Sequence, residues 1–405
     1  YLHRRQRQMC IRDSLDTLSE SYLNYSPISI ESLIGKRGKN QGSMRDVSIE
    51  KLTDYAAEDA DLTLQLKQIF DEEMKTNKVE EIFWDIEVPM IRVLADMEKE
   101  GISIDSRYLN NLDKVFESEL DKLKSGIFEK SGEEFNLNSP KQLGDILFDK
   151  LKLVSKPKKT KTGQYSTSEE VLSSLANEHE IIRSILEWRS LDKLQNTYVR
   201  SLPNEVSSRT GRIHTKFNQT VTTTGRLSSN NPNLQNIPIR TENGQKIREA
   251  FIPKNQDFEL LAADYSQIEL RVIASISKDK SMIDAFVKNQ DIHTITASKI
   301  YNVDPENITR EQRGNAKTVN FGIIYGVSAF GLSQQTNLSR SESKIMIDNY
   351  FENYPGLKDY MSSQIDFARN KGYVETIMGR RRYLQNINSQ NNMLRSGAER
   401  NAINA

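Results

Sequence analysis

The chain has 405 residues, with 56 lysines plus arginines balanced by 56 acidic residues. The length predicts about two to four domains or subdomains, and the zero formal charge gives no overall basic field that would indicate a nucleic-acid partner. The sequence shows no membrane-length apolar run and no secretory signal, and its single cysteine excludes an internal disulfide framework and fits a reducing compartment.

The first 14 residues show no apolar period and hold the only cysteine, Cys10. We interpret residues 1–14 as a non-native leader, such as a junction or translation artefact, with a disordered basic arm as the alternative. The chain also begins without methionine, so we expect it to be a fragment of a longer protein.

Several helices are predicted in the first half of the chain. Residues 55–66 form an amphipathic pattern whose apolar positions include Ala57, Leu62, Leu64 and Leu66. A helix is expected over 79–100, ended by Gly101, and residues 102–104 then favour a short strand. Asp105 is a typical N-cap for a long helix that reaches about Lys130.

Further capping signals follow. Ser139 before Pro140 predicts a helix that runs to about Leu151, and Thr167 and Glu170 have the spacing of a capping box. Another helix is expected over 181–202. Six lysines between residues 150 and 161 lie beside Pro157 and Gly163, which favours a mobile, solvated loop over a binding surface.

Residues 216–257 are polar and rich in Thr and Asn, and we expect strands and loops there. Residues 258–405 are expected to alternate strands and helices. The apolar run 260–263 predicts a short buried strand that ends at Asp264 and delivers its carboxylate to a cleft. Such a carboxylate suits Mg²⁺, which takes oxygen ligands; the alternative is an Asp that begins a turn.

A cationic and aromatic pattern occupies residues 313–325, where Arg313, Lys317, Phe321 and Tyr325 recur every fourth residue. On an α-helix this spacing forms one slowly drifting stripe. The two cations repel each other unless a polyanion lies across them, and aromatic rings can stack on a base or pack against a sugar. The stripe therefore fits a nucleoside triphosphate, with a half-buried helix carrying solvated cations as the alternative.

The chain resembles the family A DNA polymerases of the bacterial polymerase I type. The matching motifs run in the family's order: T-T-T-G-R-L-S-S-N-N-P-N-L-Q-N-I-P at 222–238, D-Y-S-Q-I-E-L-R at 264–271, D-I-H at 291–293, the helix at 313–326, G-R-R-R-Y-L at 379–384 and A-E-R-N-A-I-N-A at 398–405. The similarity extends from about Leu15 to the last residue, so a chance match of the whole set is excluded.

The resemblance implies a multidomain α+β fold with a right-hand polymerase architecture, in which thumb and fingers are helical and the palm has an incomplete antiparallel sheet. We expect six segments: a leader over 1–14, the C-terminal tail of a ribonuclease-H-like 3′–5′ exonuclease domain over 15–75, thumb and connecting helices over 76–215, the first part of the palm over 216–275, fingers over 276–360, and a return to the palm over 361–405.

The resemblance also implies a reaction, the template-directed addition of deoxynucleotides to a primer 3′-hydroxyl in DNA replication or repair. Asp264 would bind both Mg²⁺ ions, with help from the backbone carbonyl of Tyr265. Arg313, Lys317 and His293 would contact the triphosphate. Phe321 would pack on the sugar, Tyr325 would lie by the template base, and Glu269 would fill the space of a ribose 2′-hydroxyl, with Gln267 as a further nucleotide-binding residue.

Other residues would contact DNA or belong to the exonuclease. Arg226, Asn233 and Gln235 would contact the duplex near the primer end, where the minor groove shows similar acceptors in every pair, and Arg400 and Asn404 would contact template and primer. For Asn233 alone a turn residue is the better reading. Tyr55 and Asp59 match the last exonuclease motif, although one acid cannot assemble a two-metal nuclease.

The family's second catalytic carboxylate would lie beyond Ala405. We therefore expect this fragment to bind DNA and nucleotide weakly without polymerising, and its parent protein to be an active, monomeric, cytoplasmic and nucleoid-associated enzyme with no membrane partner. Three alternatives remain: a single-subunit RNA polymerase, which Glu269 argues against, a nuclease with an inert polymerase half, and a DNA-binding remnant without catalysis.

Overall fold

A computed structural model describes residues 14–404 apart from 39, 240 and 337, so the predicted leader and Cys10 lie outside the described residues except for Ser14. The chain divides into two compact units. The first unit comprises Tyr1–Met90, Gln219–Arg226 and Ala263–Ala405, and the second comprises Ile91–Asn218 and Leu227–Ala262. Helices dominate both, and the described strands pair as antiparallel two-stranded sheets, which confirms the α+β prediction.

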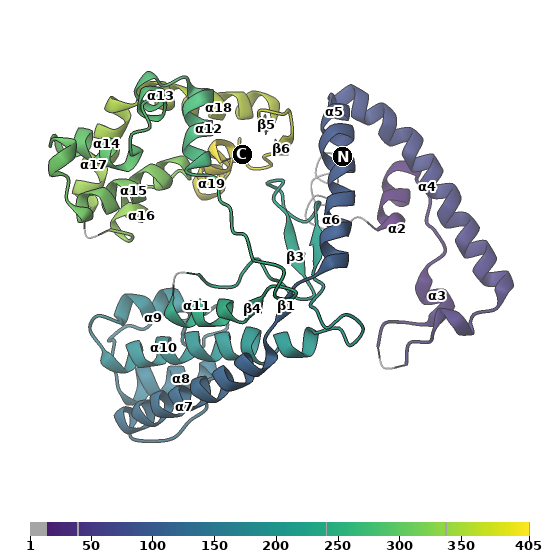
Figure 1. Ribbon diagram of the computed structural model, residues 1–405, viewed down its shortest axis with the longest axis horizontal. Coiled ribbons are helices and arrows are strands. Elements are labelled where there is room, and N and C mark those ends of the chain that lie inside the picture. Colours follow the sequence, from purple (N-terminus) through teal and green to yellow (C-terminus); the bar gives the residue numbers. More distant parts are fainter. Residues whose placement is uncertain (1–13, 39, 240, 337, 405) are drawn as a thin grey trace. The chain divides into compact units, whose positions relative to one another are not determined.

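The second unit is built around two long antiparallel helices, α7 (Ser106–Ser131) and α10 (Glu180–Leu194), which pack side by side (Figure 1). The Asp105 carboxylate accepts hydrogen bonds from the backbone N–H groups of Arg107 and Tyr108, both at 2.9 Å, so the predicted N-cap is confirmed. Phe116 of α7 is fully buried against α10, and this apolar interface holds the unit together.

Shorter elements complete this unit. They are α8 (Pro140–Gly144), a π-helical turn (Asp145–Lys150), α9 (Glu169–Leu175), a second π-helical turn (Gln195–Val199) and a 3-10 turn (Leu202–Glu205). The Ser139 hydroxyl accepts from the backbone N–H of Gln142, as predicted. The helix predicted over 181–202 is also present: it consists of α10 followed by the π-helical turn Gln195–Val199.

The predicted capping box at Thr167 and Glu170 is wrong. Ser168 is the N-cap of α9, and Thr167 is buried instead. The Arg189 guanidinium donates to the backbone carbonyl of Thr167 at 2.6 Å. A half-buried guanidinium needs acceptors, so this tertiary contact turns Thr167 away from the helix start.

Two small sheets lie in the same unit. Strand β1 (Ser103–Ile104) pairs with β4 (Phe251–Ile252), and β2 (Lys216–Asn218) pairs with β3 (Ser228–Asn230). Residues 216–257 also contain helix α11 (Glu242–Glu249), which the sequence analysis missed. The Thr241 hydroxyl caps it by accepting from the backbone N–H of Gly244, a local signal that the surrounding polar residues obscured.

The N-terminal part of the first unit is dominated by the long helix α4 (Ile49–Asn77). It is preceded by α2 (Leu15–Leu18), a π-helical turn (Ser19–Leu23), α3 (Ile30–Ile34) and a 3-10 turn (Met44–Asp46). The predicted 55–66 helix lies inside α4, with Leu62 and Leu66 buried. Leu64 is 55% exposed. It lies two positions from both Leu62 and Leu66, and residues two positions apart point to opposite faces of a helix.

The predicted helix over 79–100 is present with an interruption. It consists of α5 (Glu80–Ile82), a π-helical turn (Phe83–Glu87) and α6 (Val88–Glu100). Pro89 has no backbone N–H, so it cannot continue the regular hydrogen bonding at that point. Gly101 ends the helix at φ +65°, and a Cβ there would lie 2.5 Å from the Ile213 carbonyl oxygen, so only glycine fits.

The C-terminal part of the first unit is mostly helical (Figure 1). Its helices are α12 (Ile268–Ser277), α13 (Lys280–Val287), α14 (Ile292–Tyr301), α15 (Arg310–Ile324), α16 (Ala329–Ser333), α17 (Arg340–Asn353), α18 (Pro355–Lys371) and α19 (Asn392–Ile403), with a 3-10 turn (Pro305–Asn307). Helix α14 packs against α15 and α17, and the fully buried Tyr350 and Tyr354 lie in this core. The chain turns between α17 and α18 at Tyr354, directly before Pro355 begins α18.

The strand predicted over 260–263 is wrong. The structure has no strand there, and Leu261 is 93% exposed. An apolar run forms a strand only where a partner satisfies its backbone groups, and no described strand pairs with this one. The expected alternation of strands and helices over 258–405 reduces to helices and one hairpin, β5 (Tyr373–Glu375) with β6 (Arg381–Tyr383).

None of the described helices combines the length and the apolar character needed to cross a lipid bilayer.

Candidate functional site

Helix α15 carries the cationic and aromatic stripe. Thr309 and Gln312 form a capping box at its start: the threonine hydroxyl accepts from the glutamine backbone N–H at 3.2 Å, and the glutamine side chain accepts from the threonine N–H at 3.0 Å. Ala316, Val319 and Ile323 are buried on one side, while Arg313 and Lys317 are exposed and Tyr325 is 37% exposed. The predicted helix is confirmed. Arg313, Lys317 and Tyr325 of the stripe face solvent, whereas Phe321 is half-buried against the core.

Arg313 is held in place by Asp291. Its Nε lies 2.6 Å from the Asp291 carboxylate, which also caps α14 by accepting from the His293 backbone N–H at 3.1 Å. Burial alone would raise the pKa of Asp291, but the hydrogen bonds from Arg313 and Thr294 lower it overall, so this carboxylate stays ionised. The ion pair offsets part of the repulsion between Arg313 and Lys317.

His293 lies behind this stripe. It is 2% exposed, its ring centroid is 5.7 Å from that of Phe321, and its Nδ1 is 3.0 Å from the Asn320 side-chain nitrogen. Burial lowers the pKa of His293 to about 4, opposed by the Asp291 charge and reinforced by the Arg313 and Lys317 cations. The imidazole is therefore neutral at neutral pH.

Three residues from three different motifs meet at the other end of the stripe. The Tyr325 hydroxyl donates to the Glu269 carboxylate at 2.5 Å, and Arg226 lies 3.2 Å from the other oxygen of the same carboxylate. Burial, followed by the Glu269 carboxylate, raises the pKa of Tyr325. Glu269 thus binds one aromatic and one cationic side chain at once.

The residues around the predicted metal ligand are open to solvent. Asp264 is exposed, Tyr265 is 80% exposed, and Gln267 adopts φ +54° at the start of α12. Within the part of the chain that the structure describes, no hydrogen bond or ion pair engages the Asp264 carboxylate. Arg271 donates to the Ser266 carbonyl at 3.0 Å and so stabilises the turn that carries these residues.

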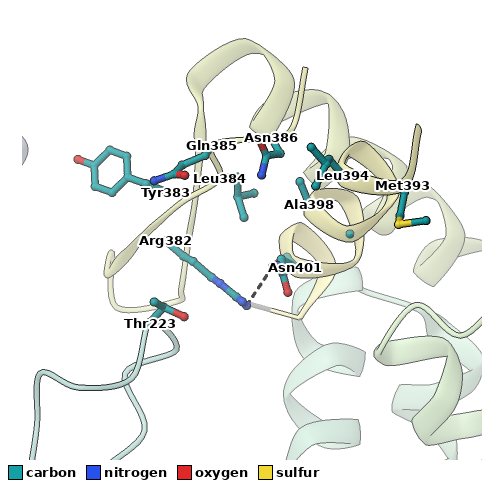
Figure 2. A pocket seen from close by; sticks show the side chains of 11 residues that line it. Thr223, Arg382, Tyr383, Leu384, Gln385, Asn386, Met393, Leu394, Ala398 and Asn401 are labelled. Carbon is teal, nitrogen blue, oxygen red and sulfur yellow. Dashed lines mark hydrogen bonds between the residues drawn. The ribbon is translucent and has the colours of Figure 1, made fainter. Parts of the chain in front are cut away.

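Helix α19 carries Arg400, and Asn404 is the C-cap residue that follows it. The Arg382 guanidinium donates to the backbone carbonyls of Asn401 and Asn404 at 3.2 and 3.3 Å, at the end of the helix where carbonyls have no helical partner. Figure 2 shows this arginine reaching from β6 to α19 along one wall of a cavity of about 370 Å³. Gly326 lets Arg400 pack closely, since a Cβ there would lie 2.6 Å from its Cγ.

Asn233 and Gln235 belong to the second unit. The Asn233 side-chain oxygen accepts from the Gln235 backbone N–H at 3.1 Å and from the Ser229 hydroxyl at 3.2 Å. Asn233 therefore stabilises a turn, which agrees with the interpretation of this residue as a turn residue. The Gln235 side chain is exposed.

Tyr55 and Asp59 lie one turn apart on α4, and both are half-buried. Burial, and then the neighbouring Asp59 carboxylate, raises the pKa of Tyr55. Their predicted exonuclease roles stay predictions.

Two family models match the chain. The model for 3′–5′ exonuclease matches residues 3–75, beginning inside the stretch that we interpreted as a non-native leader. The model for DNA polymerase family A matches residues 106–405, which is about three quarters of the chain. The chain belongs to DNA polymerase family A. The resemblance inferred from the motifs is thereby confirmed.

Similar proteins support the same family A assignment. The chain is 45% identical to DNA polymerase I of Pseudomonas aeruginosa over 97% of its length, and 46% identical to that of Geobacillus stearothermophilus over 93%. It spans less than half of these relatives, 43% and 42% of their lengths. A solved structure of the POL domain of Pol1 from M. smegmatis, in complex with DNA primer-template and dNTP, matches 97% of the chain and 65% of its own, with a TM-score of 0.83 and 38% identity. The predicted polymerase architecture is therefore confirmed.

The sequence analysis missed three polar residues of this family A chain. Thr296, Asn320 and Tyr354 are fully buried and hydrogen-bonded to one another beside His293. Asn320 directly precedes Phe321 and occupies the buried side of α15, where the helical period predicts an apolar residue. A polar residue at an apolar position was the one available signal.

The oxygen donors at Asp264 and at the Tyr265 carbonyl fit Mg²⁺, which binds through few protein carboxylates and keeps sites for water and substrate phosphates. Among the described residues, no cluster of three His, Cys, Asp or Glu side chains could enclose a metal ion. The described side chains thus offer part of a coordination sphere around one exposed carboxylate.

The buried neutral His293 predicts a pH-dependent stability. Its pKa of about 4 lies below the ordinary value of 6.5, so between these values the unfolded chain binds the extra proton. Stability should fall as the pH drops from about 6.5 towards 4, by up to about 3 kcal/mol. Urea unfolding at pH 7 and pH 4.5 measures this loss, and His293→Gln should remove most of it. An equal loss in the variant would contradict the assignment.

Proposed function

We propose that the protein is a DNA-directed DNA polymerase of the polymerase I type, which adds deoxynucleotides to a primer 3′-hydroxyl and releases pyrophosphate in DNA replication and repair. The observation that carries the proposal is the stripe of α15. It presents Arg313 and Lys317 to solvent at one end, and its other end, Tyr325, is hydrogen-bonded to Glu269. Phosphoryl transfer needs this kind of positioning and charge neutralisation more than covalent chemistry.

The cationic end of the stripe would bind the triphosphate. Lys317 is exposed and has no acidic partner among the described ion pairs, so its full charge is available to phosphate oxygens. Arg313 keeps Nη groups for the substrate while Asp291 holds its Nε. His293, neutral at physiological pH, would add a hydrogen bond without adding charge.

The aromatic end would select the base pair and the sugar. Phe321 would pack on the deoxyribose, and Tyr325 would lie by the template base. Glu269 would occupy the space of a 2′-hydroxyl, and its two hydrogen bonds to Tyr325 and Arg226 keep it there. A carboxylate anchored on both oxygens rejects a ribose more firmly than a mobile one. Gln267, at the start of α12, would complete the nucleotide contacts.

Asp264 and the Tyr265 carbonyl would hold Mg²⁺, with two ions at the complete site. Magnesium would neutralise the phosphate charge and favour deprotonation of the primer hydroxyl. Arg271 would keep the turn that carries these ligands in place through its hydrogen bond to Ser266.

The residues that we propose to contact DNA are Arg226, Asn233, Gln235, Arg400 and Asn404. The M. smegmatis relative was solved with DNA primer-template and dNTP, which supports the same partners here. We assign residues 76–215 to the thumb, 216–275 and 361–405 to the palm, 276–360 to the fingers and 15–75, with Tyr55 and Asp59, to a proofreading domain. The protein would act as a monomer in the bacterial cytoplasm, at the nucleoid.

Primer extension tests the function. The protein as its gene encodes it is mixed with a labelled primer–template, Mg²⁺ and either deoxynucleotides or ribonucleotides. We expect template-directed extension with deoxynucleotides, little with ribonucleotides, and none in Asp264→Asn. Preferred ribonucleotide incorporation would instead indicate an RNA polymerase, and DNA binding without extension would indicate a remnant that does not catalyse.

A further inference from the structure

A chain of buried hydrogen bonds runs behind the stripe of α15. The Asn320 side-chain nitrogen lies 3.0 Å from His293 Nδ1, and the Asn320 oxygen accepts from the Thr296 hydroxyl at 3.1 Å. The Thr296 hydroxyl oxygen lies 3.0 Å from the Tyr354 hydroxyl. Thr296, Asn320 and Tyr354 are fully buried and His293 is 2% exposed, so these groups depend on one another for hydrogen bonds.

The hydrogens of this chain can be assigned by counting donors and acceptors. If Tyr354 donates to Thr296, Thr296 donates to the Asn320 oxygen and the Asn320 amide donates to His293 Nδ1, every hydroxyl hydrogen has an acceptor. With the amide reversed, the Asn320 side chain no longer accepts from Thr296, so the Thr296 and Tyr354 hydroxyls have only each other as acceptors. One of their two hydrogens then has no acceptor among the described residues. A buried donor without an acceptor is costly, so the first arrangement is favoured.

The first arrangement makes Nδ1 of His293 an acceptor. We propose that Asn320 is a positioning residue that holds His293 in the tautomer with hydrogen on Nε2, so that Nε2 donates to a phosphate oxygen of the bound nucleotide. The identity of that acceptor rests on the proposed function. In the opposite tautomer the Nε2 lone pair would face the phosphate and repel it.

The tautomer matters because the His293 imidazole is neutral and can donate from only one of its two nitrogens. A histidine that became protonated near pH 7 would carry hydrogen on both nitrogens, and the tautomer would not matter. With a pKa of about 4, His293 has a single donor at physiological pH, and the neighbouring amide decides which nitrogen carries it.

The tautomer can be measured without any substrate. Histidine labelled with nitrogen-15 gives distinct two-bond coupling patterns for the two tautomers, and His293→Gln identifies the His293 signals among the four histidines. We expect hydrogen on Nε2 and not on Nδ1 at pH 7. Hydrogen on Nδ1, or an even mixture, would overturn the proposal, whatever reaction the protein catalyses.

Asn320→Asp tests the link to nucleotide binding. A carboxylate can only accept, so it draws hydrogen to Nδ1 and raises the pKa of His293. The affinity for dATP with Mg²⁺ should fall by about tenfold at pH 8 and recover as the pH drops through the raised pKa, because imidazolium again carries hydrogen on Nε2. The wild type should show no such recovery between pH 8 and 6.

The matched control is Asn315→Asp, which adds the same charge to α15 where the side chain contacts Tyr301 and not His293. It should lower dATP affinity without the pH-dependent recovery, and an equal recovery in both variants would overturn the proposal. If dATP leaves the His293 signals of the wild type unchanged, the phosphate contact fails even when the tautomer is as expected. That outcome separates an error in the proposed function from an error in the role of Asn320.

Discussion

Lys317→Ala is expected to lower kcat/KM for nucleotide insertion by about 10- to 150-fold, because a charge-assisted phosphate contact contributes about 1.5–3 kcal/mol. Lys317 lies on the exposed face of α15, one turn from Arg313, and no acidic residue neutralises it among the described ion pairs. Its positive charge is therefore directed at solvent in the free protein, and we propose that it contacts phosphate in the nucleotide complex. Single-nucleotide insertion kinetics with the gene-encoded protein measure the loss.

Two further variants give this result its meaning. Lys344 is an exposed lysine on α17, and Lys344→Ala should leave the kinetics unchanged. Lys317→Arg should recover part of the activity, since it keeps the charge with a different geometry. Unchanged kinetics in Lys317→Ala, or an equal loss in Lys344→Ala, would remove Lys317 from the triphosphate site.

Glu269→Ala is expected to reduce discrimination against ribonucleotides by about 10- to 200-fold, the range that one small group can supply by filling or opening a binding pocket. The substitution removes the carboxylate that would occupy the space of a 2′-hydroxyl. It also frees Tyr325 and Arg226, which both bind that carboxylate in the structure. The ratio of kcat/KM for dCTP to that for CTP measures the change.

Steric exclusion can be separated from the loss of hydrogen bonds. Glu269→Gln keeps the size of the side chain, so discrimination should persist. Tyr325→Phe removes only the hydroxyl that donates to Glu269 and should reduce discrimination less than Glu269→Ala. If Glu269→Ala retains full discrimination, the assignment of Glu269 to the sugar site is wrong.

The stripe and Glu269 are physically linked, which gives these two predictions a common basis. Tyr325 ends the stripe and holds Glu269, while Arg313 at its start is held by Asp291. Both ends of α15 are thereby fixed to neighbouring elements, α12 at one end and the start of α14 at the other. A helix restrained at both ends keeps its cations and rings in fixed relative positions, which nucleotide selection requires.

The sequence determined the elements whose causes are local. Asp105 and Ser139 predicted helix starts because a cap forms within a few residues of itself, and Gly101 predicted a helix end for the same reason. The period of four between Arg313 and Tyr325 predicted that these side chains share one helix face, and the order of the motifs predicted the family. These inferences needed no knowledge of distant contacts.

Only the tertiary structure decided the features that depend on distant partners. The apolar run 260–263 forms no strand, because a strand requires a second segment to pair with and a run of residues cannot supply it. Thr167 does not cap a helix as predicted, and its backbone carbonyl accepts a hydrogen bond from the distant Arg189. The meeting of Arg226, Glu269 and Tyr325, and the burial of His293 against Asn320, join residues that lie 27 to 56 positions apart. Because side-chain charge, tautomer and exposure are set by such neighbours, the sequence named the candidate residues and the fold determined their chemical state.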